Sequence, residues 1–232
     1  MNLFYAPDIG GHIYSLNKDD SNHLVRVFRA RKGDTVYLTD GKGTFYECIV
    51  TNPDPKKCEV EVSDKTSGKD ERKFLLQIAI APTKNISRFE WFLEKSTEIG
   101  IDVITPLLCD HSERKMTKPD RLTRVLIAAM KQSLKSYLPV LNELTGFNDF
   151  VKRPFKGQKF IAYVNDHTNE LFDICRPDTD TLVLIGPEGD FSKEEITEAL
   201  DHGFIPVQLG PSRLRTETAG VAACHTVNLI NL

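Results

Sequence analysis

The sequence has few of the features that mark secreted, metal-binding or membrane-spanning proteins. Its 232 residues include five cysteines, an odd number, and no two of them form a C-x-x-C pair. Neither a disulfide framework nor a zinc site is indicated, so we expect a reducing cytoplasmic location and no bound metal. No apolar run approaches the roughly 20 residues of a membrane-spanning helix, and the N-terminus lacks a signal-peptide pattern. We therefore expect neither secretion nor membrane insertion.

The short motifs of common nucleotide-binding and hydrolytic enzymes are also missing. The chain contains no G-x-G-x-x-G, no G-x-x-x-x-G-K-[ST] and no G-x-S-x-G nucleophile elbow. A dinucleotide, ATP and serine-hydrolase chemistry are therefore weak candidates. The pattern Ser192-Lys-Glu-Glu195 predicts a helix capping box, which contributes about 1 kcal/mol of local stability and no catalysis.

Positive charge is unevenly distributed, although the net charge is only −3 at pH 7. One cluster lies at 26–32 and a longer one between positions 111 and 135. Such clusters are equally well interpreted as solvated surface or as a phosphate-binding track. Their members are Arg26, Arg29, Arg31, Lys32, Arg114, Lys115, Lys118, Arg121, Arg124, Lys131 and Lys135.

The first part of the chain has the pattern of a small β-barrel or sandwich. Alternating runs predict strands at 35–39, 44–50 and 57–62, the first two joined by the turn Asp40-Gly-Lys-Gly43, with a helical patch at 20–28. The polar stretch 63–73 lacks apolar periodicity, so we interpret it as a linker. This division gives two domains, 1–70 and 71–232.

The second part alternates apolar strands with helical patterns, which predicts a largely parallel sheet covered by helices, an α/β fold. One helix is expected at 85–99, ending at Gly100, and a longer one from about Pro119. The expected strands are 74–81, 103–108, 159–164, 181–185 and 205–209.

Two loops near the C-terminus carry most of the functional information. The first is Gly186-Pro-Glu-Gly189, and the second is Leu209-Gly-Pro-Ser-Arg-Leu-Arg-Thr-Glu-Thr-Ala219. Each follows a predicted strand and precedes a predicted helix, where α/β sheets bind ligands because helix N–H groups and strand ends converge. A tight turn alone would explain the first loop, but turns rarely need the two arginines and the glutamate of the second. We expect a pocket for a small polar ligand.

Together the two loops resemble the RsmE family of 16S ribosomal RNA uracil-N3 methyltransferases. The resemblance implies a PUA-like RNA-binding β-barrel followed by a SPOUT methyltransferase α/β domain with a C-terminal trefoil knot. It also implies S-adenosylmethionine as cofactor, 16S ribosomal RNA of the small subunit as partner, and a homodimer. Further matching segments are Arg88–Ile101, Lys131–Lys135 with Pro139, and His23–Arg29 with Gly33 and Asp34.

The resemblance also assigns residues to the cofactor and to RNA, with the cofactor held mainly by backbone groups that glycine lets approach closely. The cofactor-binding residues are Leu184, Gly186, Pro187, Glu188, Gly189, Leu209, Gly210, Leu214, Arg215 and Thr216. The RNA-binding residues are His23, Arg26, Arg29, Arg31, Arg114, Arg121, Arg124, Lys131 and Lys135.

Methylation of uracil N3 needs a base and a cation, because N3 becomes nucleophilic only when its imide proton leaves and the resulting charge is stabilised. Arg215 is the candidate cation, and Glu217 is the candidate proton acceptor. A structural ion pair of Glu217 with Arg213 or Arg215 is an equally good interpretation of the glutamate.

Two residues depart from the family pattern. Asp190 stands where a second glycine is usual, and Lys135 stands where arginine is common. Aspartate tolerates the left-handed backbone, so the turn survives, whereas lysine loses the bidentate phosphate geometry of arginine. Two alternative functions remain open: a SPOUT methyltransferase that modifies a different RNA atom, and an RNA-binding protein without catalysis.

Overall fold

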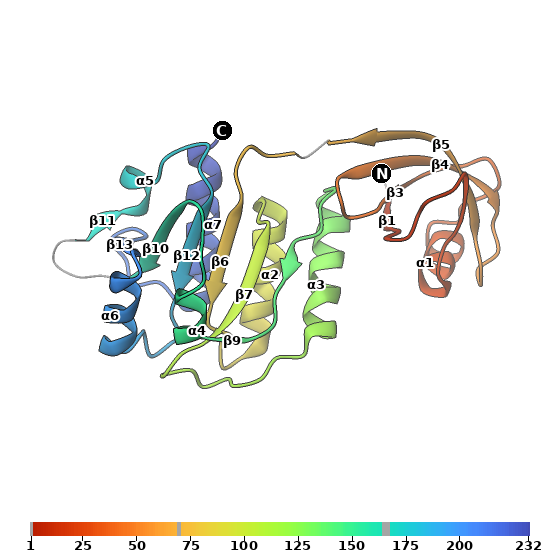
Figure 1. Cartoon of the computed structure of the whole chain (residues 1–232). Coiled ribbons are helices and arrows are strands. Elements are labelled where there is room, and N and C mark those ends of the chain that lie inside the picture. Colours follow the sequence, from red (N-terminus) through yellow and green to blue (C-terminus); the bar gives the residue numbers. More distant parts are fainter. Residues whose placement is uncertain (1, 69–70, 164–167) are drawn as a thin grey trace. The chain divides into compact units, whose positions relative to one another are not determined.

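The computed structural model of the chain describes residues 2–68, 71–163 and 168–232. The chain forms two compact units (Figure 1). The first contains Met1–Glu71 and Met130–Leu138, and the second contains Arg72–Ala129 and Pro139–Leu232. The sequence did not indicate that Met130–Leu138 packs with the first unit. The predicted boundary at residue 70 lies outside the described residues.

The first unit is built on a curled five-stranded sheet of order β1-β3-β4-β5-β2. Only the β1 and β3 pair is parallel. The expected turn joins β3 to β4, because the Asp40 carboxylate accepts the backbone N–H groups of Lys42 at 2.7 Å and Thr44 at 3.1 Å. The strands are β1 (Leu3–Tyr5), β2 (Ile13–Ser15), β3 (Thr35–Thr39), β4 (Thr44–Asn52) and β5 (Glu59–Ser67).

Part of the predicted linker is wrong, because β5 continues through residues 63–67. Asp64 pairs with Glu47 of β4, and Ser67 pairs with Thr44. This end of β5 is exposed, so it needs no buried apolar face and therefore shows no apolar alternation. A register shift at Glu47 and Cys48 further interrupts the alternation of the paired strands.

The helical patch of the first unit begins as an α-helix and ends as a π-helix. Helix α1 (Lys18–Asn22) is capped by the Asn17 side chain, which accepts the N–H of Asp20 at 2.9 Å. The π-helix η1 (His23–Val27) follows directly, and its Leu24 is buried in the core of the unit with Phe4 and Leu38.

Residues Met130–Leu138 are fixed to the turn between β3 and β4 by backbone hydrogen bonds. The Ser136 carbonyl accepts the N–H of Gly43 at 3.0 Å, and the Leu138 N–H donates to the Gly41 carbonyl at 2.9 Å. Gly43 has a φ of +99°, and a Cβ there would lie 2.3 Å from the Tyr137 ring. The glycine therefore permits the close approach that holds this segment in the first unit.

The second unit contains a parallel sheet of order β11-β13-β10-β12-β6-β7-β8, with β9 paired to β7, which confirms the expected α/β class. Residue 164, the predicted end of one strand, lies outside the described residues. The strands are β6 (Leu76–Ile80), β7 (Val103–Leu108), β8 (Val140–Leu141), β9 (Thr145–Gly146), β10 (Gln158–Ala162), β11 (Asn169–Glu170), β12 (Thr181–Ile185) and β13 (Ile205–Gln208).

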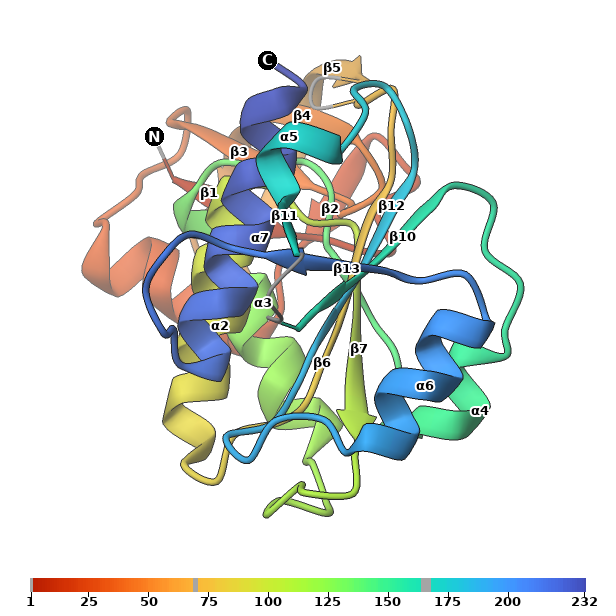
Figure 2. The ribbon, with the colours of Figure 1, turned by 90° about the vertical axis from the view of Figure 1, so that its left-hand side faces the viewer.

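Helices cover both faces of this sheet, α2 and α7 on one side and α4 and α6 on the other (Figure 2). Helix α2 ends at Gly100 as predicted, and Ser192 and Glu195 form the expected capping box of α6. Strand order alone does not trace chain threading, so the trefoil knot stays a prediction. The helices are α2 (Ile86–Ile99), α3 (Pro119–Gln132), α4 (Phe147–Val151), α5 (Leu171–Ile174), α6 (Lys193–Asp201) and α7 (Thr216–Ile230).

All five cysteines are buried, and none of them forms a disulfide with another described residue. Burial raises the pKa of Cys48 to about 12 and also raises that of Cys109, so these thiols are poor nucleophiles near neutral pH. Within the described ranges, no helix is long and apolar enough to cross a membrane. The same ranges contain no group of three or more His, Cys, Asp or Glu side chains placed to hold a metal ion.

Candidate active site

A cavity of about 490 Å³ lies in the second unit, where three parallel strands end. Ala162, Ile185 and Gln208 are the last residues of β10, β12 and β13, and all three line it. Thr216 and Ala219 line it from the first turn of α7. Open α/β sheets bind ligands at this position, and cavities of about 300–1,000 Å³ suit small molecules.

The cavity brings the two predicted loops together. Seven predicted cofactor-binding residues line it: Gly186, Pro187, Glu188, Leu209, Gly210, Leu214 and Thr216. Three do not. Leu184 is fully buried in the core, Gly189 packs against His111, and Arg215 is an exposed residue at the start of α7.

Sequence reasoning missed further lining residues, most of them at strand ends or in the second loop. The additional residues are Ala162, Tyr163, Ile185, Asp190, Val207, Gln208, Pro211, Ser212, Arg213 and Ala219. The signal that would have found the strand-end residues is the parallel sheet itself, because the carboxyl ends of neighbouring parallel strands converge at one edge.

The first loop is clamped to segments that precede it by many residues. The Glu188 carboxylate accepts the N–H of Lys84 at 2.9 Å. His111 Nδ1 lies 3.1 Å from the Gly189 carbonyl oxygen and 3.0 Å from that of Asp190. Carbonyl oxygens only accept hydrogen bonds, so Nδ1 carries the proton in this arrangement. The loop is therefore held by side chains, which keeps its backbone in one shape around the cavity.

Asp190 adopts the left-handed backbone expected where the family has glycine. Its φ is +65°, and its carboxylate accepts the N–H of Phe191 at 2.8 Å. Aspartate occupies this region at lower cost than most residues because its short side chain bonds locally. The turn is preserved, and Asp190 is one of the residues that line the cavity.

The second loop is held by a single carboxylate. Glu170 accepts the N–H of Gly210 at 2.9 Å through one oxygen and the Gln208 side-chain amide at 2.9 Å through the other. Gly210 has a φ of +102°, which L side chains rarely adopt. The Thr216 hydroxyl donates to the Gly186 carbonyl at 3.0 Å, which fixes the start of α7 to the first loop.

The structure gives Glu217 a different partner from those the sequence suggested. Its Oε1 lies 3.8 Å from Nε of Arg88 on α2, so the suggested pairing with Arg213 or Arg215 is replaced by Arg88. Glu217 is only 7% exposed, and its Oε2 has no hydrogen-bond partner among the described residues. Leaving a buried carboxylate oxygen without a donor costs free energy.

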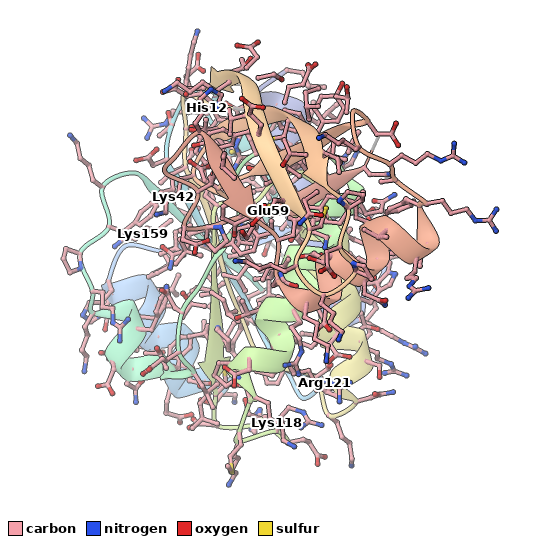
Figure 3. All side chains as sticks on the ribbon, turned by 90° about the vertical axis from the view of Figure 1, so that its right-hand side faces the viewer. His12, Lys42, Glu59, Lys118, Arg121 and Lys159 are labelled. Atoms are coloured by element: carbon pink, nitrogen blue, oxygen red, sulfur yellow. The ribbon has the colours of Figure 1, made fainter. Side chains whose placement is uncertain are left out.

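Three of the predicted RNA-binding residues have intramolecular partners. Arg114 donates to the carbonyls of Thr83 at 3.0 Å and Lys84 at 2.6 Å. Arg121, labelled near the start of α3 in Figure 3, pairs with Glu90 of α2. Lys131 pairs with Asp20 at 3.0 Å. In this structure the charged groups of these three side chains are engaged in contacts within the protein.

The remaining predicted RNA-binding residues form no ion pair within the part of the chain that the structure describes. They are His23, Arg26, Arg29, Arg31, Arg124 and Lys135, and all but the partly buried Lys135 are exposed. Free cationic side chains are the ones available to phosphates.

Comparison with known proteins places the chain in a family. Residues 70–228 match the RNA methyltransferase domain, and residues 16–63 match the RNA methyltransferase PUA domain. Curated relatives include "Ribosomal RNA small subunit methyltransferase E" of Mesomycoplasma hyopneumoniae, 29% identical over 95% of this chain and 96% of that protein. The same protein of Buchnera aphidicola from Schizaphis graminum is 25% identical over 94% and 90%. The chain belongs to the RsmE family of RNA methyltransferases.

Solved structures of similar proteins agree with this RsmE assignment. A probable rRNA-methyltransferase from Porphyromonas gingivalis is 42% identical, covers 100% of this chain and 98% of that one, and has a TM-score of 0.94. A Ribosomal RNA small subunit methyltransferase E from Neisseria gonorrhoeae, bound to S-adenosyl methionine, is 26% identical with the same coverage and a TM-score of 0.89. The expected RsmE fold is confirmed, with a PUA-like first unit that is a half-barrel and a SPOUT-type second unit.

Proposed function

We propose that this chain transfers a methyl group from S-adenosylmethionine to N3 of a uridine in 16S ribosomal RNA of the small subunit. The observation that carries the proposal is the cavity at the ends of β10, β12 and β13, lined by both loops that resemble the RsmE family. Relatives named as small-subunit methyltransferases span nearly the whole chain, and one of them was solved with S-adenosyl methionine.

The residues of the cavity fit this cofactor. When bound, S-adenosylmethionine supplies an electrophilic methyl group on a positively charged sulfonium. Glu188, Asp190 and Arg213 are charged residues of the lining, so acidic and basic groups are both available to a ligand that carries a sulfonium and a carboxylate. Gly186 and Gly210 let backbone groups approach a ligand closely. Methyl transfer from a sulfonium needs no metal.

We assign to Arg215 the stabilisation of the deprotonated uracil. It stands at the start of α7, exposed to solvent, between the lining residues Leu214 and Thr216. A guanidinium has several donors in a fixed fork, which suits the charge shared by O2 and O4 of uracil. Its preorganised positive charge lowers the cost of removing the N3 proton.

Glu217 is the proposed acceptor or relay of the N3 proton. The observation that favours this role is its Oε2, which has no donor among the residues that the structure describes. Its 3.8 Å pairing with Arg88 favours a competing structural role. The two roles differ in their kinetic consequences, because loss of a base slows the chemical step whereas loss of an ion pair mainly lowers stability.

The test of the function is a product analysis. Small ribosomal subunits and their naked RNA are incubated with the chain and labelled S-adenosylmethionine, and the RNA is digested for nucleoside mass analysis. The proposal predicts 3-methyluridine. A different methylated nucleoside would identify a methyltransferase for another RNA atom, and the absence of transfer would leave an RNA-binding protein without catalysis.

We also propose a cytoplasmic homodimer, as the family resemblance implies. Leu229 and Leu232, near and at the end of the chain, are exposed apolar side chains that a second copy would cover. Light scattering after size-exclusion chromatography is expected to give twice the chain mass of 26.2 kDa. A monomer at micromolar concentration would contradict this proposal.

A further inference from the structure

An aromatic side chain is exposed at the end of the π-helix in the first unit. Phe28 is 43% exposed and its neighbour Val27 is 61% exposed, although both are apolar. The Phe28 ring packs against the His23 ring in a tilted contact, with a centroid distance of 4.6 Å and an interplanar angle of 31°. It also meets the buried Phe4 ring edge to face at 6.4 Å. Packing fixes the ring while much of the side chain stays accessible to solvent.

The local backbone departs from regular helix where Phe28 is presented. The Phe28 N–H donates to the His23 carbonyl at 3.1 Å, the spacing of a π-turn. Arg29 follows with a φ of +57°, a left-handed conformation that is uncommon for a residue other than glycine. Both features cost free energy and cluster at functional sites. Here the π-turn and the left-handed Arg29 end the helix, and both Phe28 and Arg29 are exposed at the surface of the first unit.

Positive charge surrounds this ring along the chain. Arg26, Arg29, Arg31 and Lys32 are exposed and make no ion pair with any residue that the structure describes. The Asp34 carboxylate accepts the backbone N–H of Arg31 at 2.7 Å and so holds the turn. Unpaired nucleic acid has both kinds of group that this surface would bind. Its bases are flat rings that stack on an exposed aromatic side chain, and its phosphates are anions that contact the arginine and lysine side chains.

We propose that Phe28, backed by His23, is a stacking platform for one unpaired base of the substrate RNA, with Arg26, Arg29 and Arg31 contacting the flanking phosphates. This inference rests on the proposed function, which identifies the RNA as 16S ribosomal RNA. A duplex would not satisfy this surface, because paired bases do not expose their faces. Stacking on an aromatic ring is sequence-tolerant, so the platform supplies affinity and orientation, and base selection occurs at the cavity.

The test compares RNA with and without bases. A short fluorescently labelled single-stranded RNA and an abasic version of it are titrated with the unaltered chain, Phe28→Leu and Phe28→Tyr. Leucine keeps an apolar side chain but has no ring, whereas tyrosine keeps the ring. We expect Phe28→Leu to bind the base-containing RNA about tenfold more weakly and the abasic RNA unchanged, with Phe28→Tyr restoring affinity. Phe172→Leu, at an exposed phenylalanine of α5, is the matched control and is expected to change neither affinity.

A fluorescence readout locates the contact. Trp91 is the only tryptophan, so Phe28→Trp in a Trp91→Phe background reports on position 28 alone. If a base stacks at position 28, the base-containing RNA is expected to quench the tryptophan fluorescence and the abasic RNA is expected to leave it unchanged. The platform is overturned if Phe28→Leu binds both RNAs as tightly as the unaltered chain does. It is also overturned if Phe28→Leu loses the same affinity for the abasic RNA as for the base-containing RNA. A change in oligomeric state on Phe28→Leu substitution, with unchanged RNA binding, would instead assign the ring to a second copy and also overturn it.

These outcomes are separate from those of the proposed function. RNA binding is measured without S-adenosylmethionine, so a failure to form 3-methyluridine leaves the abasic comparison intact. Conversely, 3-methyluridine formed at an unchanged rate and with unchanged RNA affinity by Phe28→Leu would remove the platform and keep the methyltransferase.

Discussion

The cavity of the second unit and the basic surface of the first are built in different ways. The cavity is shaped by backbone, and side chains such as Glu170, His111 and Thr216 act on it by holding that backbone. The basic surface depends on side chains that form no ion pair with the described part of the chain, such as Arg26 and Arg31. A backbone-built pocket is therefore identified from sequence by its loop motifs. Counting arginines does not identify an RNA surface, because several of them are used internally.

The largest expected effect is at the cavity. Gly210→Val is expected to weaken S-adenosylmethionine binding about 100-fold, because a β-branched residue does not tolerate a φ of +102° without strain and its side chain would enter the site. Apart from its two chain neighbours, no described residue has an atom within 4 Å of a Cβ at this position, so the added side chain meets open space. Calorimetry measures the affinity, and a circular-dichroism melt checks folding. Normal affinity in a folded variant would remove Gly210 from the site.

The second prediction separates chemistry from cofactor binding. Glu217→Gln is expected to lower the rate of methyl transfer at saturating S-adenosylmethionine about 100-fold, because the amide does not accept the N3 proton. Cofactor affinity is expected to stay the same, since Glu217 does not line the cavity. Arg88→Lys, which keeps a cation beside the carboxylate, is the control. A nearly unchanged rate for Glu217→Gln would establish the structural role instead.

The third prediction tests the two kinds of arginine directly. Replacing Arg26, Arg29 and Arg31 together by alanine is expected to lower the slope of log affinity against log salt by about 2, since each phosphate contact of single-stranded RNA contributes about 0.7. Arg121→Ala is expected to leave the slope unchanged, because Arg121 is paired with Glu90. Fluorescence anisotropy between low and moderate salt measures both variants. Equal slopes for the two would show that internal pairing does not decide RNA contact.

The smallest expected effect concerns the link between the two loops. Thr216→Val removes the hydroxyl that donates to the Gly186 carbonyl and keeps the side-chain shape. We expect S-adenosylmethionine to bind about fivefold more weakly, the equivalent of about 1 kcal/mol for one hydrogen bond. Thr216→Ser keeps the donor and is expected to bind almost normally. Equal affinity for the two variants would show that the link does not shape the cavity.

The sequence predicted those elements whose pattern is local. The β3 and β4 hairpin, the end of α2 at Gly100 and the Ser192 capping box depend on neighbouring residues, and all three are confirmed. The sequence did not predict a strand at residues 63–67. That end of β5 is exposed, so its residues do not alternate between apolar and polar.

Features that depend on distant residues were not predictable from one sequence. The pairing of Glu217 with Arg88 joins α7 to α2, and the packing of Met130–Leu138 with the first unit depends on hydrogen bonds to Gly41 and Gly43. The family motif predicted both loops of the cavity. It did not predict that Ala162 and Gln208 line the cavity. These two residues reach the cavity because β10 and β13 lie beside one another in the sheet, and the motif carries no information on strand order.

We propose that the cavity of the second unit holds S-adenosylmethionine between the loops at Gly186 and Gly210. A crystal structure of the chain with the cofactor tests it most directly. We expect electron density for the ligand at the ends of β10, β12 and β13, in contact with both loops. Density at another position, or a ligand in contact with only one of the loops, would contradict it.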